Sequence, residues 1–420
     1  MNARELALIA LNKITVDRAY SNITVNDLLN KHHLTSEDAS FFTKLVYGTL
    51  QNLLYLNYQI EPFLKGRKQK PWVQNLLRLA VYQMLFLEVP DYAAINEAVL
   101  QAKKKAAALG GFVNAVLRGI QRNGRRSPEG LAPVKRLSVE HSYPEWLVQR
   151  YIQEYGLEVA ERILASEKDE KPLYIRINRL KGGEEETLKK LSEAGVAYAE
   201  THLPFAYRTE GTVQKTRAFL EGLITIQDLS AQHAVWMLAP KKGERVIDLC
   251  AAPGGKTAQI ADMMENEGEI IACDVHPHKL ELMENGFRRL GVSAKTKLLD
   301  AREVPKHFPK GYFDRVLADA PCSGLGVVFR RPEIKYELSR KNIKELVQLQ
   351  KEILEAAWEL VKPGGVLVYS TCTLNGEENE RQIEGFLARH NDAQAEEEKK
   401  ILPQEFASDG FYICKLRRSI

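Results

Sequence analysis

Long apolar stretches, abundant cysteine and strong net charge are all missing from this chain of 420 residues. No apolar run approaches the roughly 20 residues that a membrane-spanning helix needs. Five cysteines, an odd number spread widely, form neither a disulfide framework nor a cluster of metal ligands. The N-terminus lacks the charged start, apolar stretch and cleavage site of a signal peptide. We therefore expect a cytoplasmic protein with reduced thiols, no membrane association and no metal.

Length and composition indicate a folded protein with more than one domain. Hydrophobic residues make up 45% of the chain and charged residues 27%, which is typical of globular proteins. A chain of this length is too long for a single ordinary core, so two or three domains are expected. Nothing in the sequence requires a dimer, and we expect a monomer.

Positive charge is concentrated at one end of the chain. Residues 1–130 hold 17 Lys and Arg against 10 Asp and Glu, a net charge of +7, whereas residues 131–420 hold 42 against 45, a net of −3. The excess lies in three clusters, at residues 65–70, 103–105 and 118–126. On charge alone, a solvated basic face and a surface that contacts nucleic acid explain this asymmetry equally well.

The local patterns divide the chain into four parts. Residues 1–125 place apolar side chains at three-to-four spacing and predict an all-α bundle. Residues 126–139 follow a stretch rich in charge and helix breakers and predict a linker. Residues 140–235 mix helical and strand patterns and predict a small α+β module. Residues 236–420 alternate strands with helices, which predicts an α/β domain with a mostly parallel, doubly wound sheet.

Strands are expected in the last part at residues 245–249, 269–273, 295–299, 315–319, 365–369 and 411–415, with a long helix at about 339–361. The acidic and basic run at residues 396–400 is expected to form an exposed face.

A glycine-rich motif spans Asp248-Leu-Cys-Ala-Ala-Pro-Gly-Gly-Lys-Thr257 between a predicted strand and a predicted helix. Gly254 and Gly255 let backbone amides at the helix start approach a ligand closely. A P-loop would need glycine five residues before Gly255, where this chain has Cys250, and the dinucleotide pattern G-x-G-x-x-G is absent. A nucleotide-like ligand without a triphosphate is therefore the better interpretation.

Three acids follow successive predicted strands, namely Asp248, Asp274 and Asp300. Asp274 could accept hydrogen bonds from both hydroxyls of a ribose, and Asp300 could bind an adenine amino group. Any one of them alone would more simply cap the next helix. Their repetition at the end of each strand favours a cofactor crevice.

Two cysteines, Cys322 and Cys372, each follow a short apolar strand and precede polar or glycine residues. Thiols at the carboxyl ends of two strands of one sheet would face the same crevice, where α/β sheets bind ligands. This pattern indicates thiolate chemistry, but the residues alone do not say which thiol attacks. The other cysteines, Cys250, Cys273 and Cys414, lie in or beside apolar strands and are expected to be small buried side chains.

Together these motifs closely resemble the RNA cytosine-C5 methyltransferases, which have a Rossmann-like class I fold dependent on S-adenosyl-L-methionine. The resemblance lies in the glycine-rich motif, in Asp319-Ala-Pro-Cys-Ser-Gly324, and in Ser370-Thr-Cys-Thr373 followed by Glu377-Glu-Asn-Glu380. The N-terminal part, including Phe112-Val-Asn-Ala-Val-Leu-Arg118, resembles the antitermination factor NusB. This combination is similar to the bacterial Sun, or RsmB, family, which methylates the cytosine numbered 967 in 16S ribosomal RNA.

The resemblance implies roles for individual residues. Cys372 would be the nucleophile and Cys322 would assist release of the product. Asp319 would hydrogen-bond the base at N3 or N4, with Lys256 as a supporting cation. A reactive thiol requires a lowered pKa. S-adenosyl-L-methionine, converted to S-adenosyl-L-homocysteine, would contact these residues: Cys250, Ala251, Ala252, Pro253, Gly254, Gly255, Lys256, Asp274, Asp300 and Asp319.

The resemblance also suggests where RNA would be bound, with 16S ribosomal RNA as the partner. Arg330 and Arg331 could hold phosphates, although the family pattern Arg-Arg-x-Pro-Asp is altered here to end at Glu333, with Phe329 where arginine is common. The helical part would add affinity through Lys103, Lys104, Lys105 and Arg118. For Arg176 and Asn178, a contact with RNA and a purely structural role are equally favoured.

Two alternatives remain at this point. The same catalytic motifs would serve a transfer-RNA cytosine methyltransferase. A non-catalytic, NusB-like RNA-binding factor would also fit the helical part, but it would be expected to have lost its catalytic residues, and both cysteines, the glycine loop and the acids are present.

Overall fold

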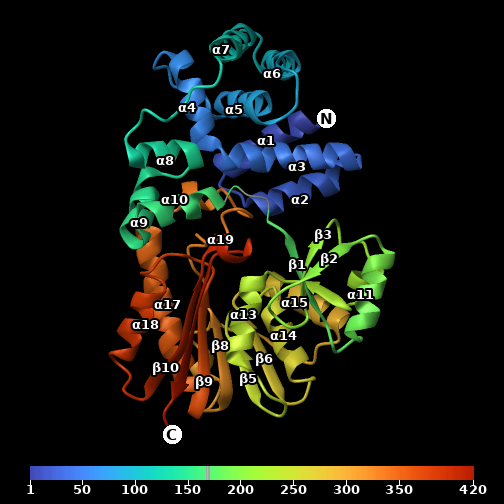
Figure 1. The fold of residues 1–420 in the computed structure, drawn as a ribbon, viewed down its shortest axis with the longest axis vertical. Helices are drawn as coiled ribbons and strands as arrows, with labels where there is room; N and C mark the ends of the chain where they lie inside the picture. Colours follow the sequence, from blue (N-terminus) through green and yellow to red (C-terminus); the bar gives the residue numbers. More distant parts are fainter. Residues whose placement is uncertain (167, 169–170) are drawn as a thin grey trace. The chain divides into compact units, whose positions relative to one another are not determined.

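The computed structural model describes residues 1–166, 168 and 171–420. The chain forms two compact units, which are drawn in Figure 1. The first, called the helical unit below, contains the described residues up to 168 and, in addition, Val328–Glu337. The second, called the α/β unit, contains the described residues from 171 to 327 and Leu338–Ile420.

Helices make up the regular structure described in the helical unit, as its apolar spacing predicts. Asn2 and Glu5 form a reciprocal capping box at the first helix, and Pro71 occupies the first turn of the fifth, where its missing N–H is tolerated. The helices are α1 (Ala3–Thr15), α2 (Ser21–His32), α3 (Ser36–Gln51), α4 (Leu53–Leu64), α5 (Pro71–Phe86), α6 (Asp91–Lys105), α7 (Leu109–Asn123), α8 (Pro133–His141), α9 (Glu145–Tyr155), α10 (Leu157–Ser166) and α16 (Ile334–Glu337).

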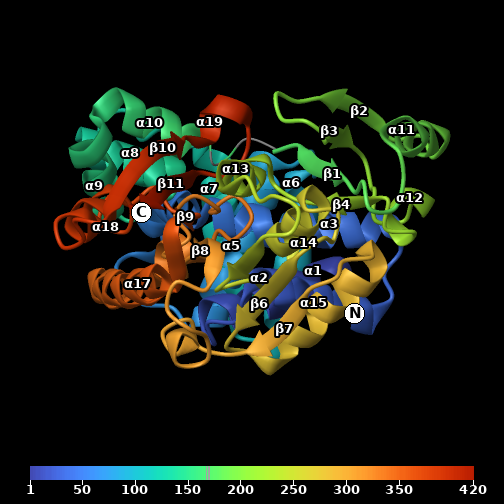
Figure 2. The same cartoon turned by 90° about the horizontal axis from the view of Figure 1, so that it is seen from below.

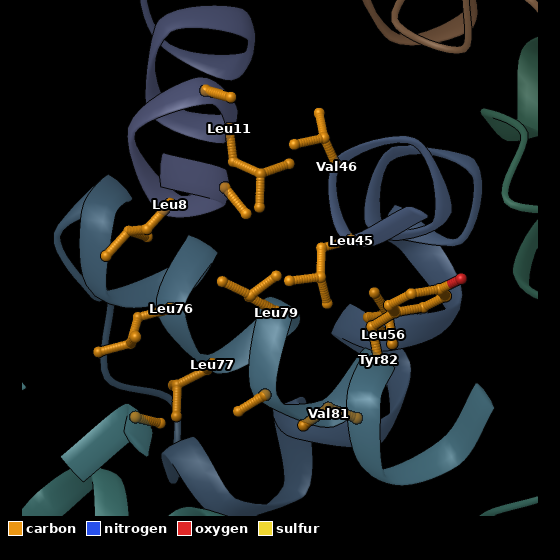
Figure 3. Close-up of a cluster of buried hydrophobic side chains, with 14 of the residues drawn as sticks. Leu8, Leu11, Leu45, Val46, Leu56, Leu76, Leu77, Leu79, Val81 and Tyr82 are labelled. Carbon is orange, nitrogen blue, oxygen red and sulfur yellow. The ribbon is translucent and has the colours of Figure 1, made fainter. Parts of the chain in front are cut away.

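The core of the helical unit is rich in leucine. Figure 3 shows Leu8 and Leu11 of α1, Leu45 of α3, and Leu76 and Leu79 of α5 converging on one another. All of these side chains are buried, and they belong to one apolar cluster. The burial of this stripe from each helix stabilises the bundle far more than helix propensity does.

The helices α8 to α10 lie in ranges expected as a linker and as part of an α+β module. Pro133 opens α8, because proline fits the first helical turn, so a stretch with breakers still begins a helix here. Leu137 and Val139 of α8 are buried, and α8 contacts α4. Residues 133–166 therefore extend the helical unit.

One short segment joins the helical unit from far along the sequence. Val328–Glu337 follows the predicted Cys322 motif, yet it packs on the N-terminal helices. The backbone N–H of Ser21 donates to the Glu333 carboxylate at 3.1 Å, and the Tyr336 hydroxyl donates to the Leu50 carbonyl at 2.8 Å. Tyr336 also packs against the leucine-rich core. This pairing is not evident from the sequence, because the two partners lie some three hundred positions apart.

The α/β unit begins with a small antiparallel sheet in the order β2-β3-β1-β4. Its strands are β1 (Leu173–Ile177), β2 (Ala197–Glu200), β3 (Ala206–Glu210) and β4 (Ile224–Ile226), and its helices are α11 (Glu184–Glu193) and α12 (Arg217–Leu220). Strand β3 was not predicted, since Ala206–Glu210 alternates only weakly between apolar and polar residues. It is held by pairing with β1 and β2 on either side.

The larger sheet has the order β10-β11-β9-β8-β5-β6-β7 (Figure 2). Strand β11 runs antiparallel to both of its neighbours, and the pairings from β9 to β7 are parallel. The strands are β5 (Arg245–Asp248), β6 (Glu269–Asp274), β7 (Lys295–Leu298), β8 (Phe313–Asp319), β9 (Val361–Thr371), β10 (Ala393–Ile401) and β11 (Phe411–Arg418).

Helices cover both faces of this sheet, which confirms the predicted doubly wound α/β domain. They are α13 (Leu229–Leu238), α14 (Gly255–Met263), α15 (Pro277–Leu290), α17 (Arg340–Leu360), α18 (Glu380–Leu387) and α19 (Pro403–Phe406), with the 3-10 turn η1 (Val304–Lys306). Val246 packs in a cluster with α13 and α14, whereas its neighbour Ile247 packs in a cluster with α17. Consecutive strand residues point to opposite faces, so the two clusters are the two faces of the sheet.

The charged run at residues 396–400 differs from its expected structure, because it lies in strand β10. The run was expected to be only an exposed face, but it forms an edge strand against β11. Most of its residues are indeed exposed, and Ile401 is buried. The strand propensity of Glu and Lys is low, but a neighbouring strand supplies the missing hydrogen-bond partners, and charge on an edge strand discourages pairing with other chains. Among the described helices, none is both long enough and apolar enough to cross a membrane.

Replacement of Leu45 by alanine tests the core of the helical unit. Leu45 has no exposed surface, so its truncation should cost about 2–5 kcal/mol. We expect hydrogen exchange of the α3 and α5 amides in the full chain to accelerate by at least about tenfold, measured by mass spectrometry. Leu100→Ala on α6 is the control, because Leu100 is 53% exposed, and it should change exchange little. Equal effects of the two substitutions would contradict this description of the core.

Candidate active site

The glycine-rich loop lies where the sequence predicts it, between β5 and α14. Gly254 is the residue before α14 and has φ of +99°, a region that residues with a side chain rarely adopt. A Cβ atom there would also lie 2.9 Å from the Phe287 ring and 3.2 Å from Met283 of α15. Both the backbone conformation and the lack of space therefore require glycine. The turn points the first amides of α14 toward the carboxyl edge of the sheet, where a polar ligand group can be received.

The last residue of β5, Asp248, supports this loop from inside. Its carboxylate is buried and accepts a hydrogen bond of 2.7 Å from the Thr257 hydroxyl of α14. Burial raises the pKa of Asp248 to about 7. The strand end and the helix start are thus tied together, which keeps the loop between them in one conformation.

The two acids that follow the next strands have different surroundings. Asp274 ends β6, is buried, and accepts at 3.0 Å from the backbone N–H of His276. Asp300 follows β7, and both of its carboxylate oxygens accept from the Arg302 guanidinium, at 2.7 and 3.0 Å. These hydrogen bonds from Arg302 lower the pKa of Asp300. A ligand amino group that binds Asp300 would have to share the carboxylate with Arg302.

Two apolar side chains beside these acids are unusually exposed. Val275 follows Asp274 and is 49% exposed, and Leu298, which lies opposite Asp274 in the β6–β7 register, is 52% exposed. Apolar surface next to strand-end acids suits a nucleoside, whose base would cover the apolar groups while its ribose meets a carboxylate.

A half-buried ion pair lies beside the loop. The Lys256 ammonium is 2.6 Å from one oxygen of Asp319, and the Ser370 hydroxyl donates to the other oxygen at 2.7 Å. Burial opposes the charge of Lys256, but the Asp319 carboxylate outweighs it and holds the pKa of Lys256 above its usual value. A negative charge on Cys372 would act in the same direction, so Lys256 and the Cys372 sulfur interact electrostatically. This supports the expected cation near a thiol.

The structure brings the two predicted cysteines together. Strands β8 and β9 are parallel neighbours in which Asp319 pairs with Ser370, so the loops that follow them leave the sheet side by side. The sulfur atoms of Cys322 and Cys372 are 3.3 Å apart, within hydrogen-bonding range for thiols. The hydrogen bond with Cys372 and burial raise the pKa of Cys322 well above its usual value. The lowered pKa expected of a reactive thiol is therefore not found at Cys322.

The remaining cysteines contribute to packing. Cys273 and Cys414 are fully buried in the apolar cluster on one face of the sheet, where burial raises the pKa of each to about 12. Cys250, in the glycine-rich loop, packs against the same cluster, and burial raises its pKa as well. These thiols stay protonated at neutral pH.

A buried polar network behind the cysteines was not foreseen from the sequence. Glu378, Gln350 and Thr373 have no exposed surface, and Ser323 and Asn375 are nearly as buried. The motif that contains Glu378 was recognised, but nothing in the pattern indicated which of its acids points inward. Only the turn between β9 and α18 decides this.

Arg176 and Asn178 have structural roles within the α/β unit. The fully buried Arg176 guanidinium pairs with Asp262 of α14 at 2.8 Å and donates to Gln227 at 3.1 Å. The Asn178 amide donates to the carbonyls of Gly222 and Leu290, at 2.7 and 2.8 Å. Both residues therefore fasten the small sheet to the larger domain, which favours the structural interpretation over a contact with RNA.

The basic residues expected to bind RNA belong to the helical unit. Lys103, Lys104 and Lys105 end α6 and are exposed, and Lys104 pairs with Glu5 at 2.6 Å. Arg118 of α7 is half-buried and donates to Gln121 at 2.8 Å. Their positions leave the three lysines able to meet a phosphate backbone.

The segment that carries Arg330 and Arg331 also lies in the helical unit. The Arg331 guanidinium stacks 4.8 Å above the ring of Tyr20 and lies 3.8 Å from the Glu333 carboxylate. Arg330 is half-buried. Arg331 is therefore engaged within the protein, and a phosphate there would have to compete with Glu333.

A group of possible metal ligands occurs in the helical unit. Ligand atoms of Glu140, His141 and Glu161 lie within 4.8 Å of one another. The Arg136 guanidinium, however, bonds to both carboxylates at 2.9 Å and already supplies the positive charge. The absence of a metal remains a prediction.

Three parts of the chain each match a family of known proteins. Residues 235–417 match the family described as 16S rRNA methyltransferase RsmB/F, residues 1–122 match the NusB family, and residues 143–213 match the ferredoxin-like domain of RsmF/B-like methyltransferases. The "probable ribosomal RNA small subunit methyltransferase B" of Bacillus subtilis is 40% identical, over 99% of both chains.

Two solved structures have a similar fold. The crystal structure of PH0851 has a TM-score of 0.85 and 27% identity, covering 100% of this chain and 99% of that one. The structure of NSun6 from Pyrococcus horikoshii with SFG has a TM-score of 0.62 and 26% identity, covering 66% of this chain and 98% of that one.

The fold and the site thus define an RNA methyltransferase, built from a NusB helical domain, a ferredoxin-like module and a methyltransferase domain with a mixed sheet. The chain belongs to the RsmB/F family of ribosomal RNA methyltransferases. Membership of this family implies a cofactor of the S-adenosylmethionine type.

Replacement of Gly254 by alanine tests the cofactor loop. The new methyl group would meet Phe287, and the left-handed backbone would be strained, so the loop should shift. We expect the affinity for S-adenosyl-L-methionine to fall by at least about tenfold, measured by calorimetry on the full chain. Gly286→Ala in α15 is the matched control, because nothing lies within 4 Å of its added methyl group. Unchanged affinity in Gly254→Ala would argue against this loop as the cofactor site.

Proposed function

We propose that the chain methylates C5 of the cytosine numbered 967 in 16S ribosomal RNA, through a covalent bond between Cys372 and C6 of the base. The observation that carries the proposal is the 3.3 Å separation of the Cys322 and Cys372 sulfur atoms at the carboxyl edge of the sheet. The substrate is inferred from relatives named ribosomal RNA small subunit methyltransferase B. The position of the cytosine is inferred from resemblance to the family.

A thiolate is needed because C5 of an intact cytosine ring is a poor nucleophile. Addition of the Cys372 sulfur to C6 breaks the aromatic system and makes C5 enamine-like. C5 can then form a bond to an electrophilic methyl group. Afterwards the proton on C5 must leave and the bond between sulfur and C6 must break, which restores the ring and frees the Cys372 thiolate.

Asp319 would support the first step. Its carboxylate is held by Lys256 on one side and by Ser370 on the other, so its direction is fixed. A base that enters the crevice could hydrogen-bond to Asp319 through N3 or N4, and charge that develops there during addition would be stabilised. Lys256 is also close enough to the Cys372 sulfur for the two to interact electrostatically.

Residues 250–256, Asp274, Asp300 and Asp319 would form the site in which S-adenosyl-L-methionine binds. The glycine turn would receive its polar amino-acid end, Asp274 the ribose, and the apolar side chains Val275 and Leu298 the adenine. When bound, this cofactor supplies the methyl group and leaves as S-adenosyl-L-homocysteine. The surroundings fit it, because acids, exposed apolar groups and helix-start amides lie along one edge of the sheet.

Cys322 is assigned to product release. It lies next to Cys372, and its raised pKa keeps the proton on sulfur in the free enzyme. Cys322 is therefore ill suited to attack, but its S–H can hydrogen-bond to the Cys372 sulfur as that sulfur leaves C6, while the proton on C5 passes to water.

The target base must also be exposed, and the RNA must be held by the protein. The target atoms are hidden in a stacked helix, so the cytosine must be unpaired or flipped out. The lysines at residues 103–105 and Arg118 would hold the RNA backbone without selecting its sequence, and Arg330 and Arg331 would add phosphate contacts after the Cys322 loop.

Substitution of the two cysteines tests the mechanism. Cys372→Ala should abolish methylation, because no nucleophile remains. Cys322→Ala should instead accumulate a protein–RNA adduct, visible as a slower band in denaturing electrophoresis, because the bond to Cys372 forms but is not released. Cys414→Ala, which removes a buried thiol of the core, is the control and should retain activity without an adduct. An adduct in Cys372→Ala instead would reverse the assignment.

Bisulfite sequencing of RNA from a strain that lacks the protein tests the substrate. We expect one small-subunit cytosine, numbered 967, to lose its protection and to regain it when the intact chain is returned. Loss of protection in a transfer RNA would point to the alternative substrate, and unchanged maps would favour a non-catalytic role.

A further inference from the structure

We propose that Glu378 is a positioning residue that holds the loops of Cys322 and Cys372 together and fixes which of the two thiols becomes the nucleophile. This inference rests on the proposed function, since it concerns the same pair of thiols.

The Glu378 carboxylate is a buried acceptor surrounded by neutral donors. It has no exposed surface and lies in the turn between β9 and α18. One oxygen accepts from the backbone N–H of Ser323 at 2.8 Å and from the Gln350 amide at 2.9 Å. The other accepts from the Ser323 hydroxyl at 2.5 Å and from the Asn375 amide at 2.8 Å. A buried carboxylate is tolerated only when its oxygens are satisfied in this way.

These contacts reach the residue that follows each cysteine. Ser323 follows Cys322, and its hydroxyl is 2.7 Å from that of Thr373, which follows Cys372. The Ser323 hydroxyl donates its only hydrogen to Glu378. Its oxygen must therefore accept the hydrogen bond from the Thr373 hydroxyl. Asn375 then donates its backbone N–H to Thr373 at 3.3 Å. A single carboxylate thus sets the direction of hydrogen bonds in both loops.

Further hydrogen bonds hold the loops of Cys322 and Cys372 at other points. The Gln350 amide of α17 also donates to the carbonyl of Pro321 at 3.0 Å, just before Cys322. The backbone N–H of Gly326 donates to the carbonyl of Cys372 at 3.0 Å. The two loops are therefore joined on both sides of the thiols, and their 3.3 Å separation depends on these joints.

The charge of Glu378 also distinguishes the thiols. Two sulfurs this close cannot both ionise at neutral pH, because the second negative charge would be repelled by the first. After the hydrogen bond with Cys372, burial and the Cys372 charge, the carboxylate of Glu378 further raises the pKa of Cys322. Lys256, by contrast, interacts favourably with a negative Cys372. The proton of the pair thus stays on Cys322, and Cys372 is left to attack.

Site-resolved alkylation of the full chain, without RNA, measures this preference directly. Iodoacetamide reacts with thiolates, so mass spectrometry of the two cysteine peptides across roughly pH 6 to 10 gives a pH profile for each thiol. In the natural chain we expect Cys372 to react at lower pH than Cys322. In Glu378→Gln, which keeps the size but removes the charge, the preference for Cys372 should shrink by about tenfold, the effect of one pKa unit.

Two further variants separate charge from positioning. Ser323→Ala keeps the carboxylate but removes the hydroxyl link between the loops, so kcat should fall by at least about tenfold while KM for the cofactor and the alkylation preference stay close to those of the natural chain. Glu384→Gln, on the exposed face of α18, is the matched control and should change neither property. If Glu378→Gln does not fold, Ser323→Ala alone still tests the positioning.

The outcomes are distinct. An unchanged alkylation preference in folded Glu378→Gln, or natural kcat in Ser323→Ala, would overturn the inference. Methylation that survives in Cys372→Ala would instead overturn the proposed function. The two failures are told apart because the alkylation assay needs neither RNA nor turnover.

Discussion

The parallel pairing of β8 with β9 is the constraint on which the active site depends. It aligns Asp319 with Ser370, and so it brings two loops that are fifty residues apart in sequence out of the sheet at the same place. The ion pair of Lys256 with Asp319 joins this pair of strands to the glycine-rich loop after β5. A shift of one residue in this register would turn Asp319 and Ser370 to opposite faces and separate the charges from the thiols.

Burial decides what each ionisable group of the site can do. The Asp319 carboxylate holds the pKa of Lys256 above its usual value despite burial, whereas burial raises the pKa of Asp248 to about 7 although Lys256 acts against it. The Cys372 sulfur lies next to Cys322, and both it and the negative charge of the buried Glu378 raise the pKa of Cys322. The chemistry proposed for the site follows from these neighbours more than from the intrinsic properties of cysteine.

The division into units does not follow the order of the sequence. Val328–Glu337 leaves the α/β unit shortly after Cys322, joins the helical unit, and returns at Leu338. Its Lys335 is almost fully buried, and its ammonium donates to the carbonyl of Gln51 at 3.1 Å. The residues that follow the Cys322 loop are therefore anchored in the NusB part of the chain, so neither unit is formed by one continuous stretch of sequence.

The sequence by itself determined most of the elements and the class of protein. Periodicity predicted the helical N-terminal part and the α/β domain, and the strand-end positions of Cys322, Cys372 and Asp274 predicted a crevice, because the carboxyl ends of parallel strands always share one edge. The tertiary structure alone decided what depends on distant partners. Strand β10 forms despite its charged residues because β11 pairs with it, Arg176 is buried because Asp262 meets it, and Glu378 points inward because Ser323 and Gln350 donate to it. Local pattern encodes which face a residue occupies, but hydrogen-bond satisfaction and charge pairing across the fold decide which polar groups are buried.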